Sequence, residues 1–397
     1  MTSNPGEQRI PNVRLVPSNE EVLANLGLLA ELAGTWEGVG FNLVARPDFE
    51  QSTNLFLELN LTTEKLVFAP IGSSVPNRGA FQDDIELFGL TYLQQISDSV
   101  TGGALHIEPG IWVTQPATTQ PPESAPAGAQ IIARMATIPH GNSVLAQGIA
   151  EKFSGPPTLS PGANSTSGAN PAFSKFPSFN STPFLATPGV IAAAGSSEKL
   201  SAPGGGFSAY TLTNAAQFTP PPPPDKSNAR TPLGNVPLVP VVPSAVITQP
   251  LVNDPITFLQ QIVQAQLDEG HTFEGVVLNI ATQASIQFFN VANFTPPPPP
   301  GSAPPVGSTT PVSVETAGGG IENIPFLEKN ADTALVYATF WIEKVTHPQR
   351  RVHQQLQYAQ MVLLNFPAVF INIPGVPNPP NFSWPHITVG SLRKTFR

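Results

Sequence analysis

Short segments of alternating apolar and polar residues dominate the first 153 residues of the chain and limit what it can fold into. After Gly34 the periodicity changes to two, and no long helical pattern interrupts the segments that follow. Regularly spaced strands without long helices are typical of an antiparallel sandwich or barrel. The predicted strands cover residues 35–45, 54–61, 65–70, 84–97, 104–114, 129–137 and 143–153.

A short helix is predicted before the first strand, from Ser18 to about Ala33. Ser18 and Glu21 form a capping-box pattern, and leucines recur behind them at helical spacing. An apolar stripe on a helix needs a partner surface. We therefore expect this helix to cover one end of the β-structure.

Residues 154–333 differ from the rest of the chain because they are rich in Pro, Ser and Gly. The sequence Phe-Thr-Pro-Pro-Pro-Pro-Pro occurs at 218–224 and again at 294–300. Polyproline forms an extended helix without internal hydrogen bonds. The runs therefore predict a stiff spacer, which we favour, or a ligand for aromatic grooves of other proteins.

This proline-rich segment is predicted to be partly ordered. A helix over 254–269 has Asp254 as its N-cap and Gly270 beyond its end. Two strands over 276–280 and 285–291 are expected to follow it and to pair. We interpret these elements as an elaboration on one mouth of a barrel.

Strand patterns return at 334–345, 352–364 and 387–396. The chain is thus divided into a leader with its helix (1–33), the first part of a barrel (34–153), the insertion (154–333) and the last strands (334–397). Pairing of the last strands with the first would remove exposed edges. The predicted fold is all-β, an antiparallel up-and-down barrel of about ten strands.

Composition excludes several classes of function. The chain contains no cysteine, so disulfides and thiolate metal sites are absent. The net charge is −9 and the basic residues are scattered, which argues against nucleic acid. No apolar run reaches about 18 residues, so no membrane-spanning helix is expected. The first residues show no secretory signal, and a cytoplasmic location is expected. The oligomeric state stays open, a homo-oligomer included.

Three motifs stand far apart in the chain: Gly-Thr-Trp-Glu-Gly-Val-Gly at 34–40, Leu-His-Ile-Glu-Pro-Gly-Ile-Trp at 105–112 and Trp-Pro-His-Ile-Thr-Val at 384–389. Glycine within strands marks bends or close backbone approach, and Trp36 is expected to plug the barrel floor. His106 and Glu108 are two residues apart, so they share one side of a strand and could form a weak charged pair. We assign this pair no acid–base role from the sequence.

In this order the motifs resemble the nitrobindin family, calycin-type β-barrels that hold a haem iron through one histidine. The resemblance covers residues 30–155 and 335–397, and the long insertion is foreign to the family pattern. It implies that His386 is the proximal iron ligand and that Phe41, Leu43 and Phe56 line the distal side. It further implies nitric oxide binding and isomerisation of peroxynitrite to nitrate at ferric haem. Such a site needs a neutral imidazole and an apolar wall.

Three alternatives stay open beside haem binding. The same barrel could hold a fatty acid or another apolar small molecule by surface burial. The chain could instead be a structural or interaction protein that uses its polyproline runs. An enzyme acting on a small organic molecule is the fourth hypothesis, although no acid–base pair is identifiable from the sequence. Phosphate-binding loops, nucleophile elbows and zinc-binding His-Glu-x-x-His patterns are absent.

Overall fold

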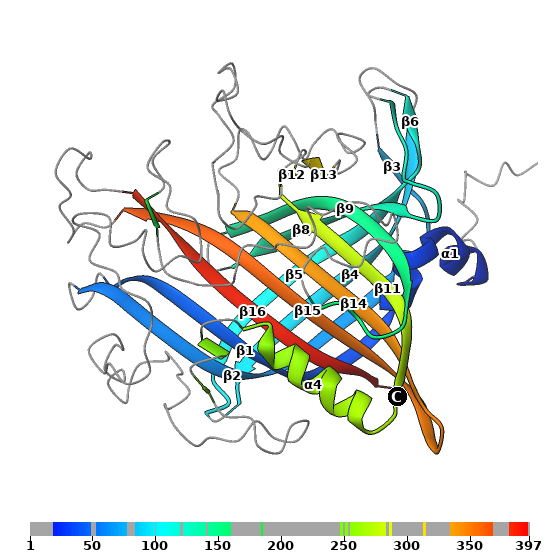
Figure 1. Ribbon diagram of the computed structural model, residues 1–397. Coiled ribbons are helices and arrows are strands. Elements are labelled where there is room, and N and C mark those ends of the chain that lie inside the picture. The colour runs from blue at the N-terminus through cyan, green and yellow to red at the C-terminus, as the bar shows by residue number, and fades with distance from the viewer. Residues whose placement is uncertain are drawn as a thin grey trace, which may run out of the picture.

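The chain folds into a closed antiparallel β-barrel of ten strands (Figure 1). The computed structural model describes residues 19–48, 53–77, 84–99, 101–119, 122–139, 142–159, 184–185, 247–248, 251–252, 255–282, 286–287, 313–314, 334–367 and 381–395. The order around the barrel is β1-β2-β4-β5-β8-β9-β11-β14-β15-β16, and β16 pairs back with β1. The predicted barrel and its closure by the last strand beside the first are confirmed.

The barrel strands are long, and shorter strands lie beside them. The ring consists of β1 (Gly34–Asp48), β2 (Thr53–Pro70), β4 (Ile85–Asp98), β5 (Ala104–Gln115), β8 (Gln130–Ile138), β9 (Asn142–Ser154), β11 (Thr272–Ala281), β14 (Leu335–His347), β15 (Arg350–Pro367) and β16 (Asn381–Thr395). The other strands are β3 (Val75–Asn77), β6 (Thr118–Thr119), β7 (Pro122–Glu123), β10 (Phe184–Leu185), β12 (Ile286–Gln287) and β13 (Ser313–Val314). Of these, β3 extends the sheet beside β4 and β10 beside β16.

Strand β2 replaces two of the predicted strands. The segments 54–61 and 65–70 are continuous, and the residues between them pair in register with β1. Thr62 lies opposite Gly40 and Glu64 lies opposite Gly38. The polar residues between the two predicted segments are therefore part of one strand.

Strand β11 lies inside the segment that was assigned to the insertion, yet it is a barrel strand. It pairs with β9 on one side and with β14 on the other. The predicted strand over 276–280 is therefore present with a different role, and its expected partner at 285–291 is described only as β12, which pairs with β13. Both polyproline runs lie outside the described residues. A deletion designed to test them would have to spare 255–282.

The N-terminal helix closes one end of the barrel, as predicted. Helix α1 (Asn19–Leu26) continues into the 3-10 helix η1 (Gly27–Leu32). Leu26 and Leu32 are buried in the same core cluster as Trp36 and the apolar residues of the barrel interior. The Trp36 indole Nε1 donates a hydrogen bond to the Leu32 carbonyl at 2.7 Å. This tryptophan thus ties the first barrel strand to the helix, while Ser18 lies outside the described residues.

Helix α4 (Thr257–Asp268) lies against the outer face of the barrel beside β16 (Figure 1). It begins at Thr257, three residues later than predicted, with Ile256 at its N-cap, and Asp254 lies outside the described residues. Its buried side includes Phe258, Leu259 and Ile262. Among the described segments, no helix is long and apolar enough to cross a membrane.

Both faces of the barrel wall are buried where β1 and β16 meet. Alternation places Trp36 and Asn42 on the inner face of β1, whereas Phe41 and Leu43 lie on the outer face and are fully buried there. Gly40 lies opposite Gly390 in the β1–β16 pairing. A Cβ atom on Gly390 would collide with the ring of Tyr358, so this glycine provides the space in which that ring lies.

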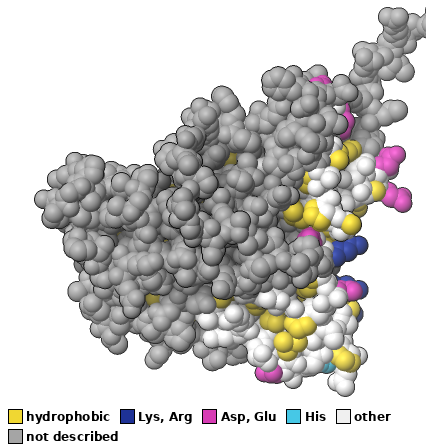
Figure 2. Space-filling model, turned by 45° about the horizontal axis from the view of Figure 1, so that its top comes forward, with side chains coloured by type: hydrophobic (Ala, Val, Ile, Leu, Met, Phe, Trp, Pro, Cys, Tyr) yellow, Lys and Arg dark blue, Asp and Glu magenta, His cyan; other side chains and the backbone are white. Residues whose placement is uncertain are grey.

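Charges on the described surface are dispersed. In the coloured part of Figure 2, acidic and basic side chains lie among apolar and uncharged ones. Exposed ion pairs include Lys344 with Glu274 at 2.5 Å and Arg350 with Glu269 at 2.6 Å. Such pairs contribute little to stability because solvent screens them.

Candidate functional site

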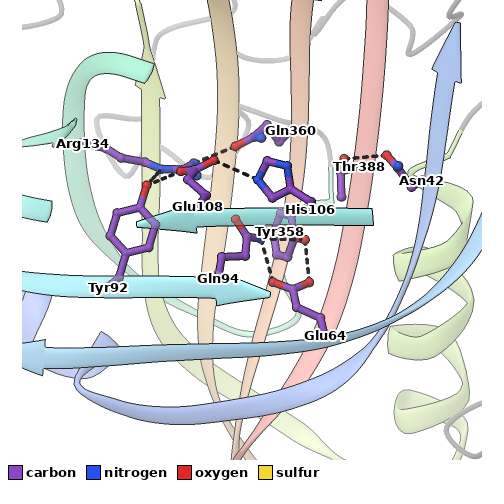
Figure 3. A network of polar contacts seen from close by, with 10 residues as sticks. All are labelled: Asn42, Glu64, Tyr92, Gln94, His106, Glu108, Arg134, Tyr358, Gln360 and Thr388. Carbon is purple, nitrogen blue, oxygen red and sulfur yellow. Dashed lines mark hydrogen bonds and ion pairs between the residues drawn. The ribbon is translucent and has the colours of Figure 1, made fainter. Parts of the chain in front are cut away.

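A network of polar side chains crosses the interior of the barrel (Figure 3). Five strands contribute to it, and each presents its members on the inner face. The members are Glu64 on β2, Tyr92 and Gln94 on β4, His106 and Glu108 on β5, Arg134 on β8, and Tyr358 and Gln360 on β15. Because barrel closure brings these strands together, residues up to 294 positions apart in the sequence are in direct contact.

The centre of the network is a buried ion pair between Arg134 and Glu108. The guanidinium Nη2 donates to Glu108 Oε1, and the two side chains are 2% and 0% exposed. Arg134 Nε donates to the Tyr92 hydroxyl at 2.8 Å, and Nη1 donates to Gln360 Oε1 at 2.6 Å. Each nitrogen of the guanidinium therefore has a partner, which a buried arginine requires.

Aromatic rings surround the same guanidinium. Its central carbon lies 5.3 Å from the ring centroid of Tyr92, 5.5 Å from that of Phe340 and 5.8 Å from that of Trp112. Ring faces attract cations, and the attraction is larger where water is excluded. The arginine is thus held from the side by three rings and from the front by a carboxylate.

The carboxyl group of Glu108 is ionised. Burial by itself would raise its pKa, but the charge of Arg134, with further help from His106 and Tyr92, outweighs burial and holds the pKa at about 2. Arg134 in turn has its pKa shifted upward by Glu108 and Tyr92 against the effect of burial. The pair therefore stays fully charged throughout the physiological range of pH.

Glu64 is the second carboxyl group of the network, and its protonation state differs from that of Glu108. Tyr358 donates to its Oε2 at 2.6 Å and Gln94 Nε2 donates to its Oε1 at 2.7 Å. Burial raises the pKa of Glu64 to about 7, and these hydrogen bonds only partly oppose the shift. Near neutral pH the network thus holds one charged carboxylate, Glu108, and one carboxyl group, Glu64, that readily exchanges a proton, an arrangement typical of acid–base sites.

His106 lies where this network meets solvent. Its Nε2 is 3.2 Å from Glu108 Oε2, so the predicted pairing of these two residues on one strand face is present. The side chain of His106 is 23% exposed, whereas that of Glu108 is fully buried. His106 is therefore the accessible member of this pair.

His386 lies on the inner face of β16. It pairs with Val362 of β15, and Thr388 and Leu392 share its side of the strand. Thr388 Oγ1 donates to Asn42 Oδ1 at 2.9 Å across the β1–β16 seam. The register that the sequence left open is therefore fixed, and the predicted iron ligand faces the interior near the end opposite α1.

The three predicted cofactor contacts are placed differently. Phe41 and Leu43 lie on the outer face of β1, so a molecule inside the barrel would not contact them. These two residues are apolar because the outer face of β1 is also buried. Apolar side chains are as favourable there as in the interior. Phe56 belongs to β2, and its side chain lies outside the described residues.

The sequence did not predict most residues of the network. Polar residues that point into a barrel have the same sequence pattern as polar residues that face solvent. Thr62 and Glu64 lie in the polar run 62–65, which resembles a solvent-exposed segment. The available signal was Arg134, a charged residue flanked by Ala133 and Met135 in a chain with only 18 Lys and Arg. A rare charge in the middle of an apolar strand indicates a buried partner.

Within the described ranges, no group of three or more His, Asp or Glu side chains could hold a metal ion. No protein-family model, curated protein or solved structure matches the chain. The barrel is thus established by the structure, and the family resemblance rests on the three sequence motifs.

Proposed function

We propose that the interior of this barrel binds a small organic molecule, with the polar network as its recognition site. The supporting observation is the buried network itself. Apolar residues of similar volume are often at least as stabilising as a buried ion pair, so Arg134 and Glu108 are a costly way to fill a barrel. Buried groups with strongly shifted pKa values, such as Glu64 and Glu108, gather at functional sites.

The lining of the interior supports an amphiphilic ligand. Strands β1, β2, β4 and β5 present polar groups inward, among them Asn42, Glu64 and His106. Strands β9, β11 and β14 form an apolar part of the wall, and their buried inward residues include Val144, Ile280 and Val336. A ligand with an apolar body and one hydrogen-bonding edge would satisfy both parts of the wall, as in ligand sites generally.

Binding is tested with Nile red, a neutral dye whose fluorescence increases in apolar surroundings. We expect saturable binding that weakens roughly tenfold in Val362→Trp, because the larger ring fills the interior beside His386. Val352→Trp is the matched control, since Val352 lies on the same strand but is 49% exposed. Ala338→Leu is a second variant that fills less of the interior and should weaken dye binding less. Equal dye affinity in the interior variants and the control would contradict binding inside the barrel.

Haem held by His386 is the second candidate, and the inner-face position of His386 beside Val362 favours it. These residues fit the requirement for one imidazole against an apolar wall. Bound haem would supply an iron centre for nitric oxide or peroxynitrite. His386 would provide the nitrogen that holds the iron, Val362 part of the apolar wall, and Thr388 and Asn42 a polar rim.

A haemin titration separates this candidate from a haem-free barrel. We expect a sharp Soret shift in the natural protein that is lost in His386→Ala. His347→Ala is the control, because His347 lies at the far end of β14, near the hairpin to β15. An unchanged spectrum in His386→Ala would show that this histidine is not the ligand. A co-purified lipid without porphyrin in native mass spectrometry would favour a fatty acid or another apolar molecule.

A further inference from the structure

We propose that His106, oriented by Glu108, acts as a general base on the molecule bound in the barrel. The substrate class is a neutral small molecule with an acidic C–H bond, such as one next to a carbonyl group. This inference rests on the proposed function, since it requires that the interior binds a small molecule. It assigns to the fold an activity for which the sequence showed no acid–base pair.

The contact with Glu108 determines which ring nitrogen of His106 carries a hydrogen. An ionised carboxylate only accepts hydrogen bonds, and Glu108 is ionised. The ring nitrogen that faces it, Nε2 at 3.2 Å, therefore carries the proton. In the neutral imidazole the other nitrogen, Nδ1, then holds the lone pair that a base needs.

Hydrogen bonds hold the carboxylate of Glu108 in place. Its Oε1 accepts hydrogen bonds from Arg134 and Tyr92, so Oε2 remains directed to His106. Gln360 and the aromatic rings hold Arg134 in turn. A carboxylate held in this way selects the tautomer and orientation of the histidine and stabilises the imidazolium that forms when a proton is taken up.

A bound molecule must be able to reach the imidazole of His106. Among Glu108, Arg134 and His106, only His106 is partly exposed, with 23% of its side chain accessible. A purely structural ion pair between Glu108 and Arg134 does not require a histidine at the solvent boundary. The arrangement places a buried carboxylate behind an accessible imidazole, which is the order of groups in a histidine base oriented by a carboxylate.

The proposed step balances without a second protein group. In an enolisation, His106 takes the C–H proton and the electron pair of that bond forms the carbon–carbon double bond. The carbonyl electron pair moves to oxygen and gives an enolate, whose charge the imidazolium of His106 balances. No oxidant or reductant is needed.

The test uses 5-nitrobenzisoxazole, a neutral apolar probe for bases. Removal of its C–H proton forms a nitrile and breaks the N–O bond, and the coloured phenolate is measured. We expect the protein to act faster than free imidazole at equal concentration, and His106→Gln to lose about 100-fold in kcat/KM. His353→Gln, a histidine on β15 near its hairpin with β14, is the control. Added imidazole should restore part of the rate in His106→Gly, which a merely structural role would not allow.

The outcomes separate the two proposals. If Nile red binds but the probe reacts no faster than with imidazole, the general-base role is overturned and ligand binding stands. An undiminished rate in a folded His106→Gln protein also overturns it. If neither the dye nor the probe interacts with the protein, both proposals are wrong.

Discussion

Replacing Arg134 with alanine is expected to destabilise the protein by about 3 to 5 kcal/mol at pH 7. The substitution leaves the charge of Glu108 buried in the barrel without its cation, and this is among the costly single changes in proteins. The measurement is the free energy of unfolding from a urea titration. Lys344→Ala, which removes one partner of the exposed pair with Glu274, should have a much smaller effect because solvent screens that pair.

A double substitution and a pH series extend this test. Arg134→Met with Glu108→Gln should recover much of the loss, because no unpaired charge remains. In the natural protein, the lowered pKa of Glu108 stabilises the fold above the ordinary carboxyl pKa of 4.5, and this contribution is lost as pH falls toward about 2. The contribution is roughly 3 kcal/mol, and Arg134→Ala should abolish it. Equal stability of Arg134→Ala and Lys344→Ala would contradict the buried ion pair.

The sequence predicts the barrel because strand alternation and turn spacing are local signals. The covering of one end of the barrel by α1 could also be predicted, because the leucines of this helix and Trp36 are apolar and must be buried together. Strand β11 was misassigned because its neighbours are rich in proline, and composition over a long window hides a ten-residue strand. Pairing with β9 and β14 is a tertiary contact that no local pattern reports.

The candidate site could be predicted only in part. The outer face of the barrel is buried in places, so apolar residues occur on both faces of a strand. Alternation identifies two faces of a strand but does not say which one faces the interior. The family resemblance implies that Phe41 lines the interior, whereas the interior side of β1 carries Gly40 and Asn42. The pairing of His106 with Glu108 followed from their spacing. The link from Glu108 to Arg134 required barrel closure and could not follow from spacing.

Stability is expected to fall as pH rises from about 5 to 8, because two buried carboxyl groups must ionise in the folded state. Burial raises the pKa of Glu343 to about 8, opposed in part by a 2.6 Å hydrogen bond from Gln355. Gln355 also bonds Gln266 of α4, so Glu343 lies near that helix on the outer wall. Burial likewise raises the pKa of Glu64 to about 7.

The direction follows from proton counting. Between the unfolded pKa near 4.5 and the raised folded pKa, the folded state binds more protons than the unfolded state, so unfolding becomes easier as pH rises. The loss is roughly 5 kcal/mol for Glu343 and roughly 3 kcal/mol for Glu64. Glu343→Gln keeps the shape of the side chain and removes the titration. It should flatten the pH dependence of urea unfolding and make the variant more stable than the natural protein at pH 8. A natural protein whose stability rises over this range would show that these carboxyl groups are ionised at no cost, and the states assigned to Glu64 and Glu343 would be wrong.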